Sequence, residues 1–247
     1  MKTLALLLLI IAAVAPLKLK MEENIGANRV SSNDLRHAID LRERIGQSAF
    51  IAILGGFRSV IADFLFIDGH FAWERVDWSH LLMRLRHVTM LQPHMTMFWD
   101  VAAWHMAWNA STAAMNDSSQ PLLARKRLQR EYIEIGRDFL ERGVANNPQN
   151  PQLYEALARL DRDKLHDHAG AAENFMKASR LPGCAAYDER FSAYELSYCE
   201  GHEREAYDRL RALFQRGEKE RLPTLISRLR LMEEQLHISP EERIRAE

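Results

Sequence analysis

The sequence predicts an all-α protein, a solenoid of antiparallel helix pairs preceded by an N-terminal hydrophobic helix. Apolar residues recur at spacings of three and four over much of the chain, which is the period of an amphipathic helix. The 247 residues include only 11 Gly and 8 Pro, too few for the many turns of an all-β chain. Hydrophobic residues make up 47% of the chain, so a core can be buried.

The N-terminus carries an uncharged apolar run over residues 3–17, with Lys2 before it and Lys18 and Lys20 after it. As a helix this run reaches about 22 Å, which is less than the roughly 30 Å of a hydrocarbon core and suits the apolar part of a signal peptide. Pro16 directly follows the one cleavage candidate, Ala13-Val14-Ala15, and disfavours cutting there. Flanking lysines also lengthen the usable span. We therefore expect residues 1–20 to be an uncleaved membrane anchor, with a cleaved signal peptide as the alternative.

Residues 21–49 predict a linker and a short helix. The first part, residues 21–33, is polar and has no apolar period. A weakly amphipathic helix then follows, with Leu35, Ile39, Leu41 and Ile45 on its apolar positions, and it ends at Gly46.

An aromatic-rich helical part is predicted over residues 50–115. All five tryptophans fall between residues 73 and 108, interleaved with methionines. Such residues at helical spacing favour core packing, while the alternative is a partner-binding face, because Met and Trp suit adaptable interfaces. The candidates for partner contact are Trp99, Trp104, Trp108 and Tyr154. Trp104 and Trp108 are the best of these, because a spacing of four places them on one helix face.

A second helical part is predicted over residues 121–247, after a small, polar break that ends at Pro121. Its one basic run contains Arg125, Lys126, Arg127 and Arg130, and acidic residues follow within a few turns. This pattern indicates a solvated helix face. The formal net charge of the chain is −1. A general nucleic-acid binder would carry a basic excess, so no nucleic-acid partner is predicted.

A repeat marks the second part, where Pro148 and Pro182 are 34 residues apart. Between them the chain places small and aromatic residues at helix-pair spacing: Tyr154, Leu157, Ala158, Ala171, Phe175 and Ala178. This arrangement resembles the tetratricopeptide (TPR) repeat, in which small residues let two helices approach and an aromatic fills the gap beside them. The match is imperfect. Asp161 stands where the pattern has an aromatic, and Ala171, Phe175 and Ala178 come one residue late.

Residues 50–217 also resemble a family of bacterial envelope-associated helical-repeat proteins of largely unassigned function. The matching segments are Gly55-Gly56-Phe57-Arg58, Ala62-Asp63, Leu91-Gln92-Pro93, Asn147-Pro148, Ala171-Ala172-Glu173-Asn174-Phe175 and the run from Ala178 to Gly183. The resemblance implies an N-terminal hydrophobic segment ahead of TPR-like repeats, protein binding without catalysis, and a place at the bacterial membrane. The charges around residues 3–17 do not fix the orientation, and the periplasmic side is favoured.

Arg58 and Asp63 are isolated charges within an otherwise apolar segment. A buried charge must be paired or hydrogen-bonded. Their spacing of five strains a direct pair, so we expect each to bond a neighbouring helix or a backbone end. A structural polar clamp is predicted, with a ligand site as the alternative.

No enzymatic, metal or cofactor site is predicted. His166 and His168 are two residues apart and point to different faces of a helix, and the other histidines, among them His94 and His105, make no metal-binding pair. The chain has no phosphate loop, dinucleotide fingerprint or nucleophile elbow. Cys184 and Cys199 are too far apart on a continuous helix for a disulfide, so two free thiols are predicted.

The sequence thus predicts a non-catalytic membrane-anchored scaffold that binds a protein or peptide partner. The alternatives are a structural accessory subunit of a larger membrane complex and, less favoured, a metal- or cofactor-binding protein.

Overall fold

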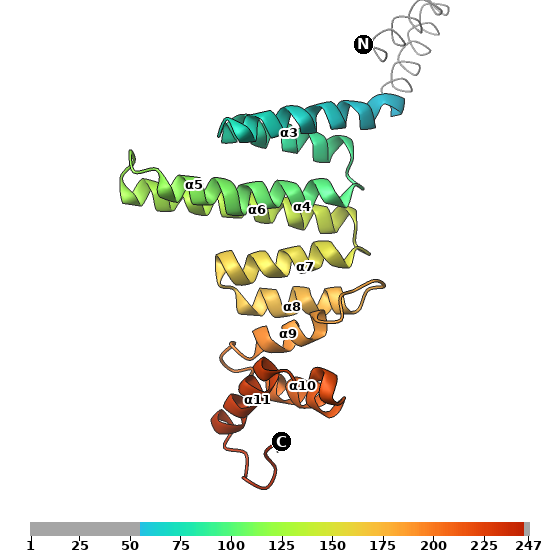
Figure 1. Ribbon diagram of the computed structural model, residues 1–247, viewed down its shortest axis with the longest axis vertical. Coiled ribbons are helices and arrows are strands. Elements are labelled where there is room, and N and C mark those ends of the chain that lie inside the picture. Colours follow the sequence, from blue (N-terminus) through green and yellow to red (C-terminus); the bar gives the residue numbers. More distant parts are fainter. Residues whose placement is uncertain (1–54, 245–247) are drawn as a thin grey trace, which may run out of the picture. The chain divides into compact units, whose positions relative to one another are not determined.

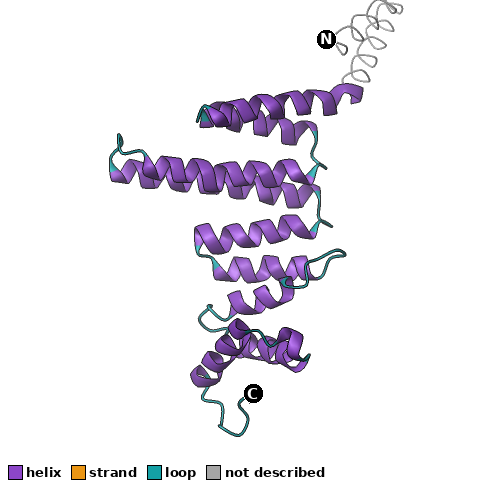
Figure 2. Ribbon diagram, viewed as in Figure 1, coloured by secondary structure: helices purple, strands orange, loops and turns teal. Residues whose placement is uncertain are grey.

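The computed structural model describes residues 55–244, which form helices joined by turns, with no strand in that range (Figure 2). The all-α prediction is confirmed for these residues. The predicted anchor at residues 3–17 and the predicted linker and helix at 21–49 lie outside them. Within the described range, no helix has the length and apolarity that a membrane crossing needs. The chain divides into two units between Phe57 and Arg58, and the unit that begins at Arg58 contains the helices from α3 to α11.

The helices follow one another with short connections (Figure 1). A first helix ends at Glu74. After it come α3 (Trp78–Leu91), α4 (Thr96–Trp104), the π-helical turn η1 (His105–Ala110), α5 (Ser111–Asn116), α6 (Leu122–Asn146), α7 (Pro151–Leu160), the π-helical turn η2 (Asp161–Leu165), α8 (His168–Ser179), α9 (Asp188–Leu196), α10 (Glu203–Gln215), the 3₁₀ turn η3 (Glu218–Glu220) and α11 (Pro223–Gln235).

Neighbours in the chain are also neighbours in space. The backbone stays helical through both ends of η1, so α4, η1 and α5 form one continuous rod, and α6 returns along it (Figure 1). The later helices pack in sequence, α7 on α8, α8 on α9, α9 on α10 and α10 on α11. Each pair therefore covers the apolar face of the next, as the sequence pattern requires.

Local sequence explains where several helices begin. Asp77 accepts a hydrogen bond from the His80 amide, and Asn150 accepts one from the Leu153 amide. Asp167 accepts a hydrogen bond from the Gly170 amide. Each side chain satisfies a backbone donor that the first helical turn leaves free. Pro151 at the first position of α7 also suits a helix start.

Two glycines let α6 lie close to the α4–η1–α5 rod. A Cβ atom at Gly136 would lie 2.6 Å from the Cβ of Ala107, and one at Gly143 would lie 2.8 Å from the Cβ of Trp99. Any larger residue would push the helices apart, because protein interiors are close-packed. Glycine at positions 136 and 143 therefore allows α6 to pack closely against α4 and η1.

The core does not divide at the polar break between α5 and α6. One cluster of buried side chains runs from Ala72 to Leu160, and a second runs from Ala172 to Met232. The predicted parts 50–115 and 121–247 therefore share the first cluster. The break is the turn of a helical hairpin, and the rise in charge after it reflects the solvated outer face of α6.

The π-helical turn η2 lies in the interval where the predicted repeat pattern shifts by one residue. A π-helical turn closes its hydrogen bonds over one more residue than an α-helical turn, so it inserts one residue into the helix. It lies between Leu157 and Ala171, the interval in which the offset arises. Asp161, which replaces the expected aromatic, is its first residue and is fully buried.

The predicted clamp at Arg58 and Asp63 is wrong in one respect, because the structure leaves both residues exposed. Arg58 does reach a backbone end, since its Nη2 donates to the carbonyl oxygen of Met90 at 3.5 Å. The side chain that joins these helices is instead Asp68, whose Oδ2 lies 2.9 Å from His80 Nε2 and 2.5 Å from Arg84 Nε. These hydrogen bonds lower the pKa of the Asp68 carboxyl.

The prediction of two free thiols is confirmed for Cys184 and Cys199. The single continuous helix assumed between them is wrong, because only α9, Asp188–Leu196, lies in that interval. Gly183 and Gly201 lie in turns with positive φ on either side of α9.

Candidate functional site

A cleft of about 280 Å³ lies between the α4–η1 rod and α7 with its turn η2. The π-helical turn η1 follows α4 and the π-helical turn η2 follows α7, so each side of the cleft includes one. Such turns are frequent at functional sites. The lining side chains are Asp100, Val101, Ala103, Trp104, Trp108, Leu140, Ala156, Arg159 and Asp163. The volume falls just below the roughly 300–1,000 Å³ of small-molecule pockets, so the cleft has room for one or two side chains of a partner.

Two stacked tryptophans form one wall of the cleft. The rings of Trp104 and Trp108 are 5.0 Å apart between centroids, at an interplanar angle of 16°. Trp104 ends α4 and is 52% exposed, whereas Trp108 lies in η1 and is half-buried. Lys164 of η2 places its Nζ 5.3 Å from the centroid of the Trp108 ring. The Trp104 ring thus keeps an open indole face, while the Trp108 ring already makes a cation–π contact with Lys164.

Two of the three charged lining residues already have partners of opposite charge. Arg159 pairs with the buried Glu155, which also accepts a hydrogen bond from the Tyr187 hydroxyl at 2.5 Å. Asp163 accepts two bonds from Arg162, at 2.6 and 3.2 Å.

Asp100 is the third charged lining residue, and it makes no hydrogen bond or ion pair through its side chain within residues 55–244. Desolvation by its surroundings raises the pKa of the Asp100 carboxyl, and Arg159 partly opposes this. Among the charged side chains that line the cleft, Asp100 is therefore the one without an oppositely charged partner in the described residues.

An aromatic cluster continues from the cleft toward the first helix. Trp73 lies 5.3 Å from His70 and 5.4 Å from His105, measured between ring centroids. His105 also bonds to Asn109, with 3.1 Å between its Nδ1 and Asn109 Nδ2. Burial lowers the pKa of His105, with a smaller contribution from His70. The ring of His105 thus favours the neutral form, which suits its place among aromatic side chains.

The structure separates the four predicted contact residues. Trp104 and Trp108 line the cleft together. Trp99 is only 1% exposed, and its Nε1 donates to the carbonyl oxygen of Pro93 at 2.8 Å, so it is a packing residue and not an accessible one. Tyr154 lines a different recess, of about 560 Å³, with Arg137, Glu141, Asp167, Glu173 and Lys177 among its walls.

Sequence reasoning missed Asp100, Arg159 and Asp163. One signal was present in the sequence, since Asp100, Trp104 and Trp108 follow one another at intervals of four and therefore share a helix face. Nothing in the sequence placed α7 opposite that face, so Arg159 and Asp163 required the tertiary structure.

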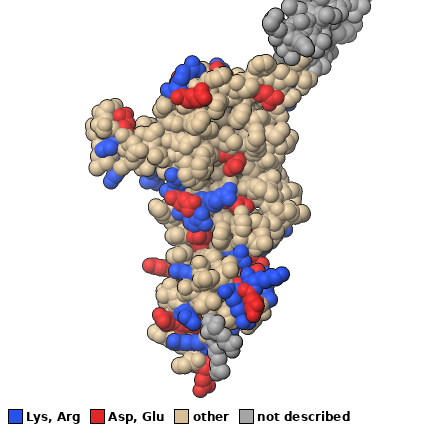
Figure 3. Space-filling view, viewed as in Figure 1, with Lys and Arg blue, Asp and Glu red and all other residues tan. Residues whose placement is uncertain are grey.

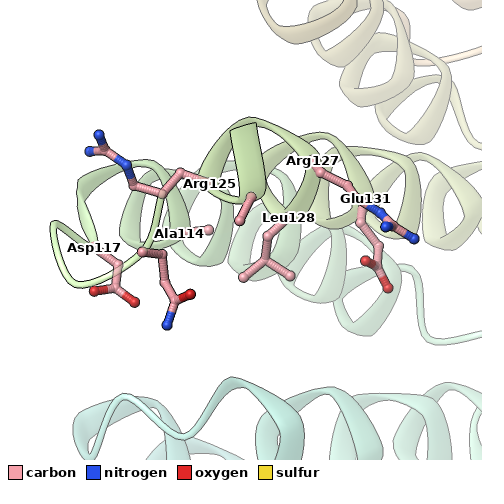
Figure 4. A pocket seen from close by; sticks show the side chains of 8 residues that line it. Ala114, Asp117, Arg125, Arg127, Leu128 and Glu131 are labelled. Carbon is pink, nitrogen blue, oxygen red and sulfur yellow. The ribbon is translucent and has the colours of Figure 1, made fainter. Parts of the chain in front are cut away.

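A further recess of about 370 Å³ lies at the hairpin between α5 and α6, and its lining comes from both helices (Figure 4). Arg125 bridges the hairpin by donating from Nη1 to the carbonyl oxygen of Met115 at 3.1 Å. Asp117 accepts from the amide and hydroxyl of Ser119 in the turn. These polar groups close the hairpin, so the recess has a structural explanation.

Surface charge is mixed in sign. On the face shown in Figure 3, Lys and Arg side chains are interspersed with Asp and Glu. In the part of the chain covered by the structure, no group of three or more His, Cys, Asp or Glu side chains has the geometry to hold a metal ion. The cleft itself offers aromatic stacking, hydrogen bonds and one free carboxylate, which are means of recognition.

Comparison with models of protein families, with curated proteins and with solved structures finds no match to this chain.

Proposed function

We propose that this protein is a non-catalytic, TPR-like scaffold that binds a peptide segment of a partner protein in the cleft between α4–η1 and α7–η2. A second part of the proposal is that residues 3–17 hold it at a bacterial membrane, with the helical part on the periplasmic side. The observation that carries the proposal is the exposed, stacked pair of Trp104 and Trp108 at the cleft wall.

The exposure of Trp104 supports a binding role. The other tryptophan of the same helix, Trp99, is fully buried, so α4 does bury an indole where a neighbouring helix covers it. An indole left half in water loses apolar burial that a bound partner would restore, at about 25 cal/mol per Å². Tryptophan is also enriched among the residues that dominate binding at protein interfaces.

Paired charges beside the tryptophans support recognition of a polypeptide. Arg159 and Asp163 are each held by a neighbour, so their side chains present fixed donors and acceptors. A few placed polar groups around an apolar contact are typical of specific binding sites.

Trp104→Ala is expected to weaken binding of a cleft-directed peptide by at least about 10-fold, the loss typical of a central interface tryptophan. The measurement is selection of a random 12-residue peptide library on the full-length protein in detergent, followed by titration of the enriched peptides. The control is Leu123→Ala, because Leu123 is 81% exposed at the start of α6 and is not among the lining residues. Enriched peptides that bind Trp104→Ala and the unchanged protein equally would contradict the proposal.

A second candidate function, an accessory subunit of a membrane complex, is favoured by a separate surface. The first helix exposes an apolar stripe, defined as Val60, Ile61, Phe64, Ile67 and Phe71. Their exposed fractions run from 37% to 69%, and their spacing of three and four places them along one helix face. Elsewhere in this unit such faces are covered by the next helix, so the fitting occupant is an apolar helix of a partner subunit.

A photo-crosslinking amino acid at Phe64 is expected to join the full-length protein in membranes to one partner polypeptide. The same complex should be recovered in detergent in fixed stoichiometry, and Phe64→Asp should dissociate it. A crosslinker at Leu123 on α6 serves as the control. Crosslinks from position 64 only to residues 1–54 of the same chain, or to a second copy, would contradict the subunit hypothesis.

A further inference from the structure

We infer that the cleft selects an arginine side chain of its peptide partner, with the guanidinium stacked on the open face of Trp104 and bonded to the carboxylate of Asp100. This inference rests on the proposed peptide-binding function and adds the chemical class of the side chain that is bound.

The unpartnered carboxylate is the first argument. Among the charged residues that line the cleft, Arg159 and Asp163 already contact opposite charges, and Asp100 does not. Asp100 is exposed, so a cation that enters the cleft can contact its carboxylate directly and is attracted by its charge. An incoming acidic side chain would meet this carboxylate as a like charge, while the one lining cation, Arg159, is already occupied by Glu155.

The open indole face of Trp104 is a second contact for the same cation, and it does not depend on Asp100. Trp104 and Asp100 both line the cleft and lie four residues apart on α4, so one ligand group can reach both. The negative face of an indole attracts cations, and tryptophan is the best of the aromatic residues for this contact. Lys164 already sits over Trp108 in this way, while Trp104 keeps 52% of its surface exposed.

The shape of the two groups favours arginine over lysine. A guanidinium is planar, so it can stack on an indole and still direct N–H groups at a carboxylate in its own plane. An ammonium is a strongly hydrated point charge and makes only one of these contacts well. A cleft of about 280 Å³ also suits a single long side chain better than a whole folded element.

The test replaces the arginine of a selected peptide with citrulline, which has nearly the same shape and no charge. On the full-length protein in detergent we expect citrulline to bind at least about 10-fold more weakly than arginine. On Asp100→Asn the preference for arginine over citrulline should fall to about two- to five-fold, the value of an exposed cation–π contact with Trp104 alone. The matched control is Asp138→Asn, since Asp138 is an exposed carboxylate of α6 that pairs with Arg142 and is not among the lining residues, and it should keep the full preference for arginine.

The outcomes separate this inference from the proposed function. Peptides that need Trp104 but contain no arginine, or that bind equally well with citrulline, would overturn the arginine subsite and leave peptide binding intact. An arginine preference that is undiminished in Asp100→Asn would also overturn it. If no peptide binding depends on Trp104, the proposed function fails, and the subsite fails with it.

Discussion

Trp99→Ala is expected to lower the free energy of unfolding by about 3–5 kcal/mol, the range for removing a buried large aromatic side chain. Trp99 is 1% exposed and packs against Phe139, with 6.3 Å between ring centroids. The change also leaves the carbonyl oxygen of Pro93 with one donor fewer, although the side chain of Asn147 still donates to it at 2.8 Å. Urea denaturation of the full-length protein, followed by circular dichroism, measures the loss.

Trp104→Ala provides the matched control for this prediction, because both residues are tryptophans of α4. Trp104 is 52% exposed, so its removal should cost less than about 1 kcal/mol of stability. We therefore expect stability and the proposed binding to separate along one helix, with stability depending on Trp99 and peptide binding on Trp104. Equal losses of stability for the two variants would show that this division is wrong.

The titration of Asp161 is expected to lower the free energy of unfolding by about 2–3 kcal/mol as the pH rises from 4 to 8. Burial raises the pKa of this carboxyl from 3.8 to about 6, and the charges of Asp167 and Glu141 act in the same direction. Arg137, whose Nε lies 3.5 Å from Asp161 Oδ1, and the amide of Asn174 oppose the rise. The folded state therefore favours the protonated form.

The sign follows from the two pKa values. The contribution of protonated Asp161 to the free energy of unfolding is fully present below the unfolded pKa of 3.8. It is lost as the pH rises through the folded pKa of about 6. Asp161→Asn keeps a neutral side chain at every pH, so its stability relative to the unchanged protein should rise over this interval. Asp138→Asn on α6 is the control, because Asp138 is exposed and pairs only with Arg142 at 3.5 Å. A difference between Asp161→Asn and the unchanged protein that does not vary with pH would contradict the prediction.

Much of the fold could be predicted from the sequence, because helix formation is governed by local residue types. The apolar period, the caps at Asp77, Asn150 and Asp167, and Pro151 at a helix start are all readable in the chain. The one-residue offset between Leu157 and Ala171 in the predicted repeat pattern coincides with the π-helical turn η2.

The candidate site was predicted in part. A spacing of four identified Trp104 and Trp108, and the same argument extends to Asp100. It could not decide which tryptophans are buried, because burial depends on which helix lies opposite. Gly143 lies against Trp99, whereas the cleft lies beside Trp104. The isolated charges Arg58 and Asp63 were misread as buried for the same reason.

The sequence by itself determined that residues 55–244 are helical, where several of their helices begin, and which residues share each helix face, because these properties depend on neighbours within a few residues. Only the tertiary structure decided which faces meet. The approach of α6 at Gly136, the burial of Asp161 and the opposition of Asp100 to α7 all join residues that are distant in the chain. Such contacts are selected by close packing of whole surfaces, and no local pattern encodes them.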